Sequence, residues 1–167
     1  MVKAIQIRQT GGPDVIALAD VEVPDPGAGE VRVRHTAIGL NFIDTYHRSG
    51  LYPVPLPSGL GLEAAGVVEA VGSGVTALRE GDRVAYGTGP IGSYAEARVM
   101  PADKLVKLPD GIGDETAAAM MLKGMTAQYM IRRIYPVKAG ETVLFHAIAG
   151  GVGLIACQWL KALGATV

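Results

Sequence analysis

The sequence predicts a mainly β first part followed by the beginning of a parallel α/β part. Up to about residue 109, short runs of alternating side chains are separated by turns rich in Gly and Pro. From Asp114 the apolar spacing and the Ala and Met content become those of helices. Near the end, a glycine cluster stands between a strand-like run and a helical run. Many short strands with such turns are typical of a barrel or a sandwich.

Composition favours a packed core and narrows the classes of partner. Hydrophobic residues make up 49% of the 167 residues and charged residues 19%, which argues against wholesale disorder. A net charge of -1 gives no electrostatic reason to expect a nucleic acid or a membrane surface as partner. Because Cys157 is the single cysteine, an intramolecular disulfide and a multi-cysteine zinc site are excluded. We expect a cytoplasmic protein.

The predicted strands lie in the first part of the chain. Residues 30–40 alternate most regularly, as a strand with one buried face does. A Pro- and Gly-rich turn at residues 24–30 precedes this run. The other runs that predict strands are residues 3–9, 15–24, 64–72, 82–87 and 92–109.

One helix is expected among the strands, over residues 41–50. Asn41 is a candidate N-cap, and Asp44 stands three residues later, where its side chain can complete the cap. Gly50 is a candidate C-terminal stop. The proline-rich stretch 51–61 then predicts a stiff loop.

The second part is predicted to begin a parallel α/β arrangement. Residues 114–134 predict helices interrupted at Gly124, residues 140–147 a buried strand, and residues 150–165 a helix with Gly164 at its C-terminal end. The last three residues have the composition to begin one more strand. Since a doubly wound nucleotide-binding fold needs about six strands, we expect only the start of such a fold.

The glycine cluster has the pattern of a dinucleotide-binding turn. Ala147, Gly150 and Gly153 are spaced at intervals of three, with Gly151 in addition. Small residues there permit a tight turn, close approach of a diphosphate and close packing of helix on strand. The N–H groups at the start of the helix attract phosphate. A glycine-rich turn that binds nothing stays open as the alternative. The residue that would distinguish NAD from NADP is expected about 20 residues further on, beyond Val167.

Four segments carry a resemblance to a known family, and they are residues 39–53, 57–75, 81–86 and 146–165. They closely resemble the bacterial quinone oxidoreductases, zeta-crystallin-like members of the medium-chain dehydrogenase/reductase superfamily. The resemblance covers nearly the whole chain. It implies a GroES-like β-barrel catalytic domain at residues 1–122 and the incomplete start of a Rossmann NADPH-binding domain at residues 123–167. The chain is therefore expected to be the N-terminal part of a longer protein.

The activity that the resemblance implies is zinc-independent transfer of a hydride from NADPH to a quinone. A homodimer is expected for the longer protein. Two alternatives stay open. One is an enone or alkene reductase of the same superfamily, and the other is a non-catalytic barrel fragment or interaction module.

The resemblance also bears on metal binding. Zinc-dependent alcohol dehydrogenases of the same superfamily place a catalytic Cys where this chain has Asn41, and a His where it has Leu62. Neither an amide nor an aliphatic side chain replaces a thiolate or an imidazole as a zinc ligand, and the three histidines are dispersed along the chain. We therefore expect no metal, and an acceptor that is reduced without a Lewis acid to stabilise an alkoxide.

The expected site residues follow from the resemblance. Tyr46, Tyr52 and Asn41 are the expected catalytic residues, since a phenol at the substrate cleft can donate to a quinone oxygen or pack on its ring. The residues expected to contact the cofactor are Asn41, Phe42, Ile43, Asp44, Thr45, Tyr46, Thr126, Gly150, Gly151 and Val152.

Each of these residues has an ordinary structural alternative. Asn41 can act as a helix cap only, the tyrosines can serve packing only, and Thr126 can be a solvent-exposed or helix-internal threonine. Glu63 is expected in a structural salt bridge or in a cofactor contact. Lys123 is expected in solvent, and Cys157 is expected to be buried.

Overall fold

The backbone of the computed structural model, which describes residues 1–167, divides into two units, Met1–Ala119 and Met120–Val167. The predicted domain boundary between residues 122 and 123 stays a prediction, because this division does not show which part folds alone.

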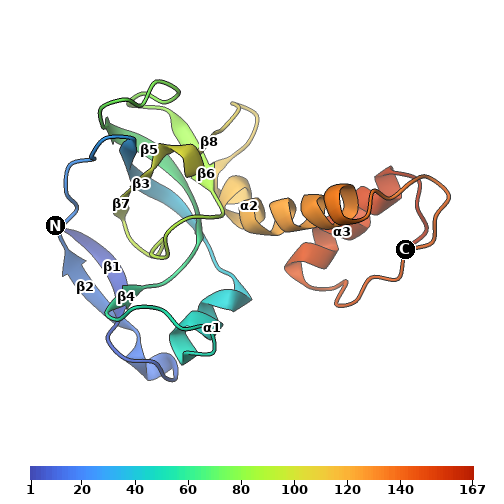
Figure 1. The fold of residues 1–167 in the computed structure, drawn as a ribbon, viewed down its shortest axis with the longest axis horizontal. Coiled ribbons are helices and arrows are strands. Elements are labelled where there is room, and N and C mark those ends of the chain that lie inside the picture. The colour runs from blue at the N-terminus through green and yellow to red at the C-terminus, as the bar shows by residue number, and fades with distance from the viewer. The chain divides into compact units, whose positions relative to one another are not determined.

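The first unit consists of two antiparallel sheets, which confirms the prediction of a mainly β fold. One sheet has the strand order β2-β1-β4 and the other has the order β7-β3-β5-β6-β8 (Figure 1). The strands are β1 (Val2–Ile7), β2 (Ala17–Val21), β3 (Glu30–Gly39), β4 (Ser58–Gly59), β5 (Glu63–Val71), β6 (Arg83–Tyr86), β7 (Ala97–Pro101) and β8 (Val106–Lys107). Short 3-10 helices cover Pro13–Val15 and Ala102–Lys104.

The loop before β7 joins the two sheets. The N–H of Ile5 in β1 donates to the Tyr94 carbonyl at 2.7 Å, and the N–H of His35 in β3 donates to the Glu96 carbonyl at 2.8 Å. One short segment thus satisfies backbone groups on a strand of each sheet. This loop also places the Tyr94 side chain inside the first unit, where it contributes to the candidate site.

Strand β3 is an interior strand of the larger sheet, and its alternation gives it one buried face. It pairs with β5 on one side and β7 on the other. Val31 and Val33 are fully buried, whereas Arg32 and Arg34 face outward and both form ion pairs with Glu69. The core around them also contains Val68, Leu78 and Val84.

Helix α1 (Phe42–Ser49) follows β3 directly, as the sequence predicts. Asn41 is its N-cap in extended conformation, and Gly50 ends it with a φ of 83°. This left-handed conformation carries no steric penalty at glycine. The cap places the start of α1 directly after the end of β3.

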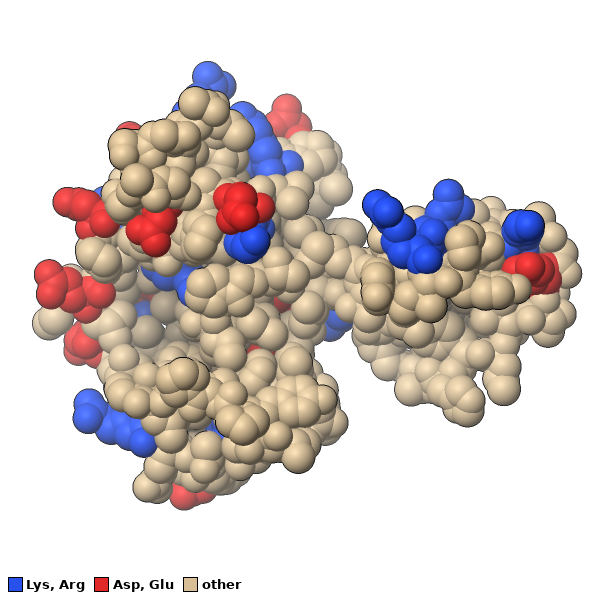
Figure 2. All heavy atoms as spheres, viewed as in Figure 1, with Lys and Arg blue, Asp and Glu red and all other residues tan.

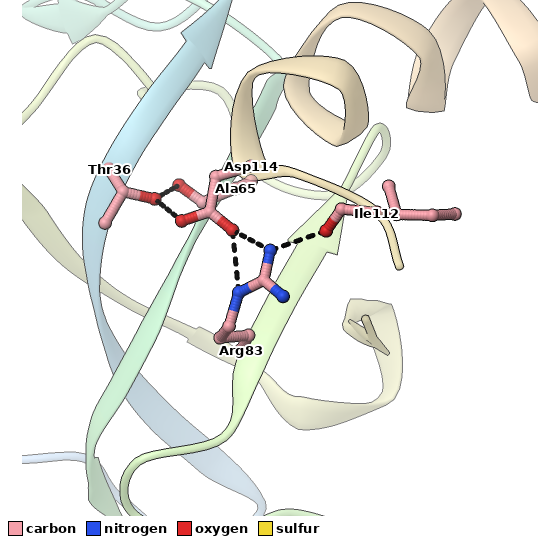
Figure 3. A network of polar contacts seen from close by, with 5 residues as sticks. All are labelled: Thr36, Ala65, Arg83, Ile112 and Asp114. Atoms are coloured by element: carbon pink, nitrogen blue, oxygen red, sulfur yellow. Dashed lines mark hydrogen bonds and ion pairs between the residues drawn. The ribbon is translucent and has the colours of Figure 1, made fainter. Parts of the chain in front are cut away.

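A polar network fixes the beginning of helix α2 (Asp114–Gln128) on the larger sheet (Figure 3). Asp114 accepts the Thr36 hydroxyl from β3 at 2.6 Å and the Arg83 Nε–H from β6 at 2.9 Å. Arg83 also donates to the Ile112 carbonyl at 2.6 Å. The Thr36 hydroxyl oxygen also lies 3.3 Å from the Ala65 carbonyl oxygen of β5. Side chains from three elements therefore meet at one carboxylate.

The predicted interruption at Gly124 is wrong. Helix α2 continues through Gly124 and passes into a wider π-helical segment, Tyr129–Ile134. A Cβ atom at Gly124 would lie 3.3 Å from the Met120 side chain, so the position is closely packed rather than a turn. A single glycine lowers helix stability by about 1 kcal/mol relative to alanine without ending the helix.

Helix α3 (Gly151–Ala162) forms where the glycine cluster predicts it. Gly164 follows with a φ of 82°, and the Ala165 N–H returns to the Leu160 carbonyl at 3.0 Å, as in a Schellman-type end. Its buried side packs with the segment after α2. The core of this unit contains Ile131, Val137, Leu160 and Ala165.

The predicted buried strand over residues 140–147 is wrong. A single parallel bridge joins Thr142 to Thr166, with the Val143 N–H donating to the Thr166 carbonyl at 2.8 Å. Leu144 is 86% exposed. Parallel strands are stable when neighbours and helices cover them, and only this one pairing is present here.

The second unit is rich in basic residues. Figure 2 shows Lys and Arg side chains gathered over one side of it. Its charged residues are Lys123, Arg132, Arg133, Lys138 and Lys161, against one acid, Glu141. None of the helices has the length and apolar character needed to cross a membrane.

Candidate functional site

The site in the first unit is built around Asn41, at the junction of β3 and α1. The Asn41 N–H donates to Asp44 Oδ2 at 2.9 Å, and the Asp44 N–H donates to the Asn41 carbonyl at 3.0 Å. Both residues are buried. The predicted capping role is therefore present, with the Asp44 carboxylate returning to the cap residue.

The Asn41 side chain also makes a contact that a helix cap does not require. Its Nδ2 donates to Glu63 Oε2 at 2.7 Å, and Glu63 is fully buried. A Cβ atom at Gly39 would lie 2.5 Å from that same oxygen, so glycine is needed for the approach. Because the carboxylate must accept, the Asn41 amide nitrogen faces Glu63 and the amide oxygen is turned away from it.

Tyr94 is a member of this cluster that the sequence did not reveal. Its hydroxyl donates to Asp44 Oδ2 at 2.7 Å. Burial, followed by the hydrogen bond and the charge of Asp44, raises the pKa of Tyr94. The glycines around the loop at residues 87–92 were the available signal, but they do not indicate a partner fifty residues earlier.

Three aromatic rings, two on α1 and one just after it, contact one another. The Tyr46 and Tyr52 rings meet edge to face with centroids 5.2 Å apart, and the Phe42 and Tyr46 rings do so at 5.3 Å. Tyr52 is 49% exposed. The structure thus brings together the two predicted catalytic tyrosines and leaves Tyr52 accessible to a ligand. The neighbouring predicted residues, Ile43 and Thr45, are half-buried, and the Thr45 hydroxyl donates to the Phe42 carbonyl at 2.7 Å.

The predicted phosphate-binding turn lies in the second unit, at the start of α3. Gly150 is the N-cap, and the first N–H groups of a helix have no partner within it. A Cβ atom at Gly153 would lie 2.4 Å from the Ile148 carbonyl oxygen, so this glycine permits close packing of turn and helix. Ala147 has a φ of 55°, a backbone conformation that residues other than glycine rarely adopt.

Lys123 lies against the same turn. A Cβ atom at Gly151 would lie 2.7 Å from Lys123 Cδ, and Lys123 is half-buried. The lysine expected in solvent is therefore half-buried, because its stem packs on the glycine. Cys157, expected to be buried, is likewise only half-buried.

Thr126 lies in helix α2, with its hydroxyl donating to the Leu122 carbonyl at 2.8 Å. This is the helix-internal arrangement weighed as the alternative to a cofactor contact. Val152 is half-buried in the first turn of α3. The roles of Thr126, Gly150, Gly151 and Val152 toward a cofactor stay predictions.

The donor groups fit a dinucleotide better than a metal ion. Around Asn41, an amide N–H points at the Glu63 carboxylate, which is a hydrogen bond rather than a ligand set. The structure contains no group of three or more His, Cys, Asp or Glu side chains placed to hold an ion. At the start of α3, exposed Gly150 and Gly151 present backbone without side chains, as an approaching diphosphate requires.

Known proteins match this chain over nearly its whole length. The Alcohol dehydrogenase GroES-like domain family matches residues 27–110. A quinone oxidoreductase of Pseudomonas aeruginosa is 64% identical over 165 residues, covering 98% of this chain and 51% of that protein. The crystal structure of Escherichia coli quinone oxidoreductase complexed with NADPH has a TM-score of 0.95 at 53% identity, covering 98% of this chain and 50% of that one. A 2-haloacrylate reductase of a Burkholderia species is 49% identical over 174 residues, covering 100% of this chain and 52% of that protein.

These matches confirm the resemblance and the GroES-like β fold that it implies. The chain spans about half the length of the curated relatives it matches, and corresponds to their N-terminal part. The chain therefore belongs to the alcohol dehydrogenase GroES-like family, as a relative of the N-terminal half of the bacterial quinone oxidoreductases.

Proposed function

We propose that this chain is the N-terminal part of an NADPH-dependent, zinc-independent quinone reductase. The observation that carries the proposal is the buried hydrogen bond from Asn41 Nδ2 to Glu63 Oε2 at 2.7 Å. Asn41 stands where the zinc-dependent members place a catalytic Cys. Its amide oxygen, which the capping box directs at the Asp44 N–H, keeps a second lone pair that can accept a hydrogen bond. A nicotinamide carboxamide or a ribose hydroxyl has a suitable donor.

The turn at the start of α3 is proposed to hold the cofactor diphosphate. The N–H groups of the first turn and the positive end of the helix attract phosphate oxygens. The basic character of residues 120–167 acts in the same direction, because a dinucleotide phosphate carries several negative charges. NADPH rather than NADH is proposed because the E. coli relative was crystallised with NADPH.

Tyr46 and Tyr52 are proposed to bind the quinone. When bound, NADPH supplies a hydride, and complete reduction of a quinone to a hydroquinone consumes one hydride and one proton. The Tyr52 ring, 49% exposed, offers a flat face for a quinone ring and a hydroxyl that donates to a quinone oxygen. The Phe42 ring beside Tyr46 extends this apolar surface and reduces access of water.

A quinone suits a site without zinc. Reduction of a simple carbonyl creates an alkoxide that a Lewis acid stabilises. In a quinone, the incoming charge spreads over a ring that becomes aromatic, so hydrogen-bond donors and correct positioning suffice.

A second candidate function is reduction of an activated alkene. The Burkholderia relative, named 2-haloacrylate reductase, is 49% identical to this chain. Hydride addition to such an alkene also avoids a developing alkoxide at a saturated carbon. The aromatic residues of α1 accommodate either class of planar acceptor, so the substrate separates the two candidates.

The proposal is tested by titrating the purified chain with NADPH while cofactor fluorescence is followed, and then adding a small quinone, an enone or 2-chloroacrylate. Binding with quinone turnover supports the first candidate, and turnover of the alkenes alone supports the second. A chain that binds no NADPH would leave the alternative of a non-catalytic module. The expected homodimer of the longer protein stays a prediction that sedimentation of that protein tests.

A matched pair of glycine variants shows whether binding uses the turn. Gly151→Ala places a methyl group against Lys123 and against the proposed diphosphate, so NADPH affinity is expected to fall about tenfold or more. Gly111→Ala introduces the same atom where nothing lies within 4 Å. The second variant is expected to bind NADPH as the unchanged chain does.

A further inference from the structure

Tyr94 is fixed to the barrel through both its backbone and its ring. Its N–H donates to the Leu60 carbonyl at 2.9 Å, and its own carbonyl accepts the Ile5 N–H at 2.7 Å. A Cβ atom at Gly61 would lie 2.4 Å from Tyr94 Cδ1, so the ring packs directly on that glycine. The position of the hydroxyl is therefore set by the sheets and not by helix α1.

The Tyr94 hydroxyl selects one oxygen of Asp44. It donates to Oδ2 at 2.7 Å, and the same oxygen accepts the Asn41 N–H at 2.9 Å. Asp44 is 4% exposed, and its other oxygen, Oδ1, has no hydrogen-bond partner. An unsatisfied buried oxygen costs free energy, so the carboxylate keeps this orientation only because two donors hold Oδ2.

Asp44 connects Tyr94 to the Asn41 amide. Asp44 Oδ2 holds the Asn41 backbone N–H, and the side chain of the same asparagine donates to Glu63 Oε2 at 2.7 Å. The hydrogen bonds form a series from Tyr94 through Asp44 and Asn41 to Glu63. In a buried environment such a series orients its members more strongly than separate hydrogen bonds would.

The raised pKa of Tyr94 supports donation from its hydroxyl to Asp44. Burial raises the pKa of its phenol, and the hydrogen bond to Asp44 and the charge of Asp44 raise it further. The hydroxyl therefore keeps its proton at neutral pH and remains a donor to the carboxylate.

We propose that Tyr94 is a positioning residue for the nicotinamide end of the site: acting through Asp44, its hydroxyl fixes the Asn41 amide that contacts the cofactor. The inference rests on the proposed function, since Asn41 matters to the cofactor only if NADPH binds there. Tyr94 itself touches neither cofactor nor substrate in this account.

The test is Tyr94→Phe in the nitrogen-15-labelled chain, with two readouts. The first is the pair of Asn41 side-chain amide signals in the NMR spectrum, assigned by their loss in Asn41→Asp. The second is the Kd for NADPH. The Asn41 signals are expected to shift and to exchange faster with water, and the Kd is expected to rise roughly fivefold.

Tyr86→Phe is the matched control. It removes another tyrosine hydroxyl from the same barrel, one that pairs with His35 Nε2 at 2.9 Å and has no hydrogen bond to α1. A general loss of packing would affect both variants. The proposal expects the Asn41 signals and the Kd to stay unchanged in Tyr86→Phe.

Two results overturn the proposal: unchanged Asn41 signals in folded Tyr94→Phe, or shifted signals with an unchanged Kd. If the unchanged chain binds no NADPH, the proposed function fails for this chain, and the Asn41 signals alone still decide whether Tyr94 positions the amide. If Tyr94→Phe does not fold, Asp44→Asn is compared with the Asp44→Asn/Tyr94→Phe double variant. The Asn41 signals are then expected at the same positions in both variants. A difference between the two variants contradicts the proposed route through Asp44.

Discussion

Asn41 and Glu63 form a buried amide-to-carboxylate hydrogen bond of 2.7 Å between the cap of α1 and the start of β5. The two residues are far apart in the sequence and meet because β3 and β5 are adjacent antiparallel strands, with Gly39 opposite Glu63. The bond fixes the side chain that the proposed cofactor contact needs. It also places an amide donor against a buried carboxylate, and exchanging these two groups tests the pairing.

Asn41→Asp is expected to destabilise the chain by about 2 kcal/mol or more at pH 8, because it replaces a donor by a second buried carboxylate. At pH 5 the loss becomes smaller, since protonation of one acid restores a donor. Urea unfolding at both pH values measures the difference.

The double variant Asn41→Asp/Glu63→Gln provides the control. It reverses the direction of the hydrogen bond and removes the extra charge, so it is expected to recover most of the stability. A double variant no more stable than Asn41→Asp would show that the pairing itself contributes little.

The Thr36–Asp114–Arg83 network predicts an acid-dependent part of the stability. The Thr36 hydroxyl, followed by the Arg83 guanidinium, lowers the pKa of Asp114 below its usual 3.8. The stabilisation is therefore complete above that value and is lost as the pH falls through the lower folded-state pKa. Asp114→Asn is expected to cost about 1 kcal/mol at pH 7, with the difference from the unchanged chain shrinking below about pH 4.

The control for this network is Asp110→Asn, an exposed acid nearby. It is expected to change the unfolding free energy little at either pH. Equal losses in Asp110→Asn and Asp114→Asn would mean that overall charge, and not the network in Figure 3, sets the acid response.

His35 predicts a second pH dependence, near neutrality. Its Nδ1 donates to the Ala95 carbonyl at 2.6 Å, and the Tyr86 hydroxyl donates to its Nε2 at 2.9 Å, so the folded chain holds the ring neutral. Burial lowers the pKa of His35 below its usual 6.5. Stability is complete above that pH and is lost as the pH falls toward the folded-state value, because the unfolded chain takes up the proton first.

His35→Gln is expected to remove this part of the pH dependence between pH 7 and pH 5.5, whereas the exposed His146→Gln retains it. Unfolding free energies from urea titrations at the two pH values provide the measurement. The same slope in both variants would exclude His35 as its source.

Gly153→Ala is expected to destabilise the second unit by about 2 kcal/mol, because the added Cβ would lie 2.4 Å from the Ile148 carbonyl oxygen. Trp159 in α3 is the only tryptophan, so its fluorescence reports the unfolding of this unit. Gly111→Ala, with open space around it, is the control. A Trp159 transition at the same urea concentration in both variants would refute this packing role.

Local patterns predicted the elements whose residues are neighbours in sequence. The alternation of residues 30–40 corresponds to β3, and the Asn41, Asp44 and Gly50 spacing corresponds to the ends of α1. These succeed because the period of a strand and the chemistry of a cap depend only on residues a few positions apart.

The failures arose where distant partners decide the structure. Tyr94 gains its role from Asp44 and Gly61, and neither pairing leaves a periodic signal. Residues 140–147 have the composition of a buried strand, but Leu144 has nothing to cover it. The helical context around Gly124 outweighs the low helix propensity of one glycine.

The central claim is that this chain binds NADPH, with the Asn41 amide and the first turn of α3 each as a proposed contact. The most direct measurement is an NMR titration of the nitrogen-15-labelled chain with NADPH, with Gly111→Ala and Gly151→Ala run in parallel. The account predicts saturable shifts of the Gly150, Gly151 and Val152 amides together with the Asn41 side chain, weakened in Gly151→Ala only. Saturable binding that moves neither group, or no shift at any NADPH concentration, would contradict it.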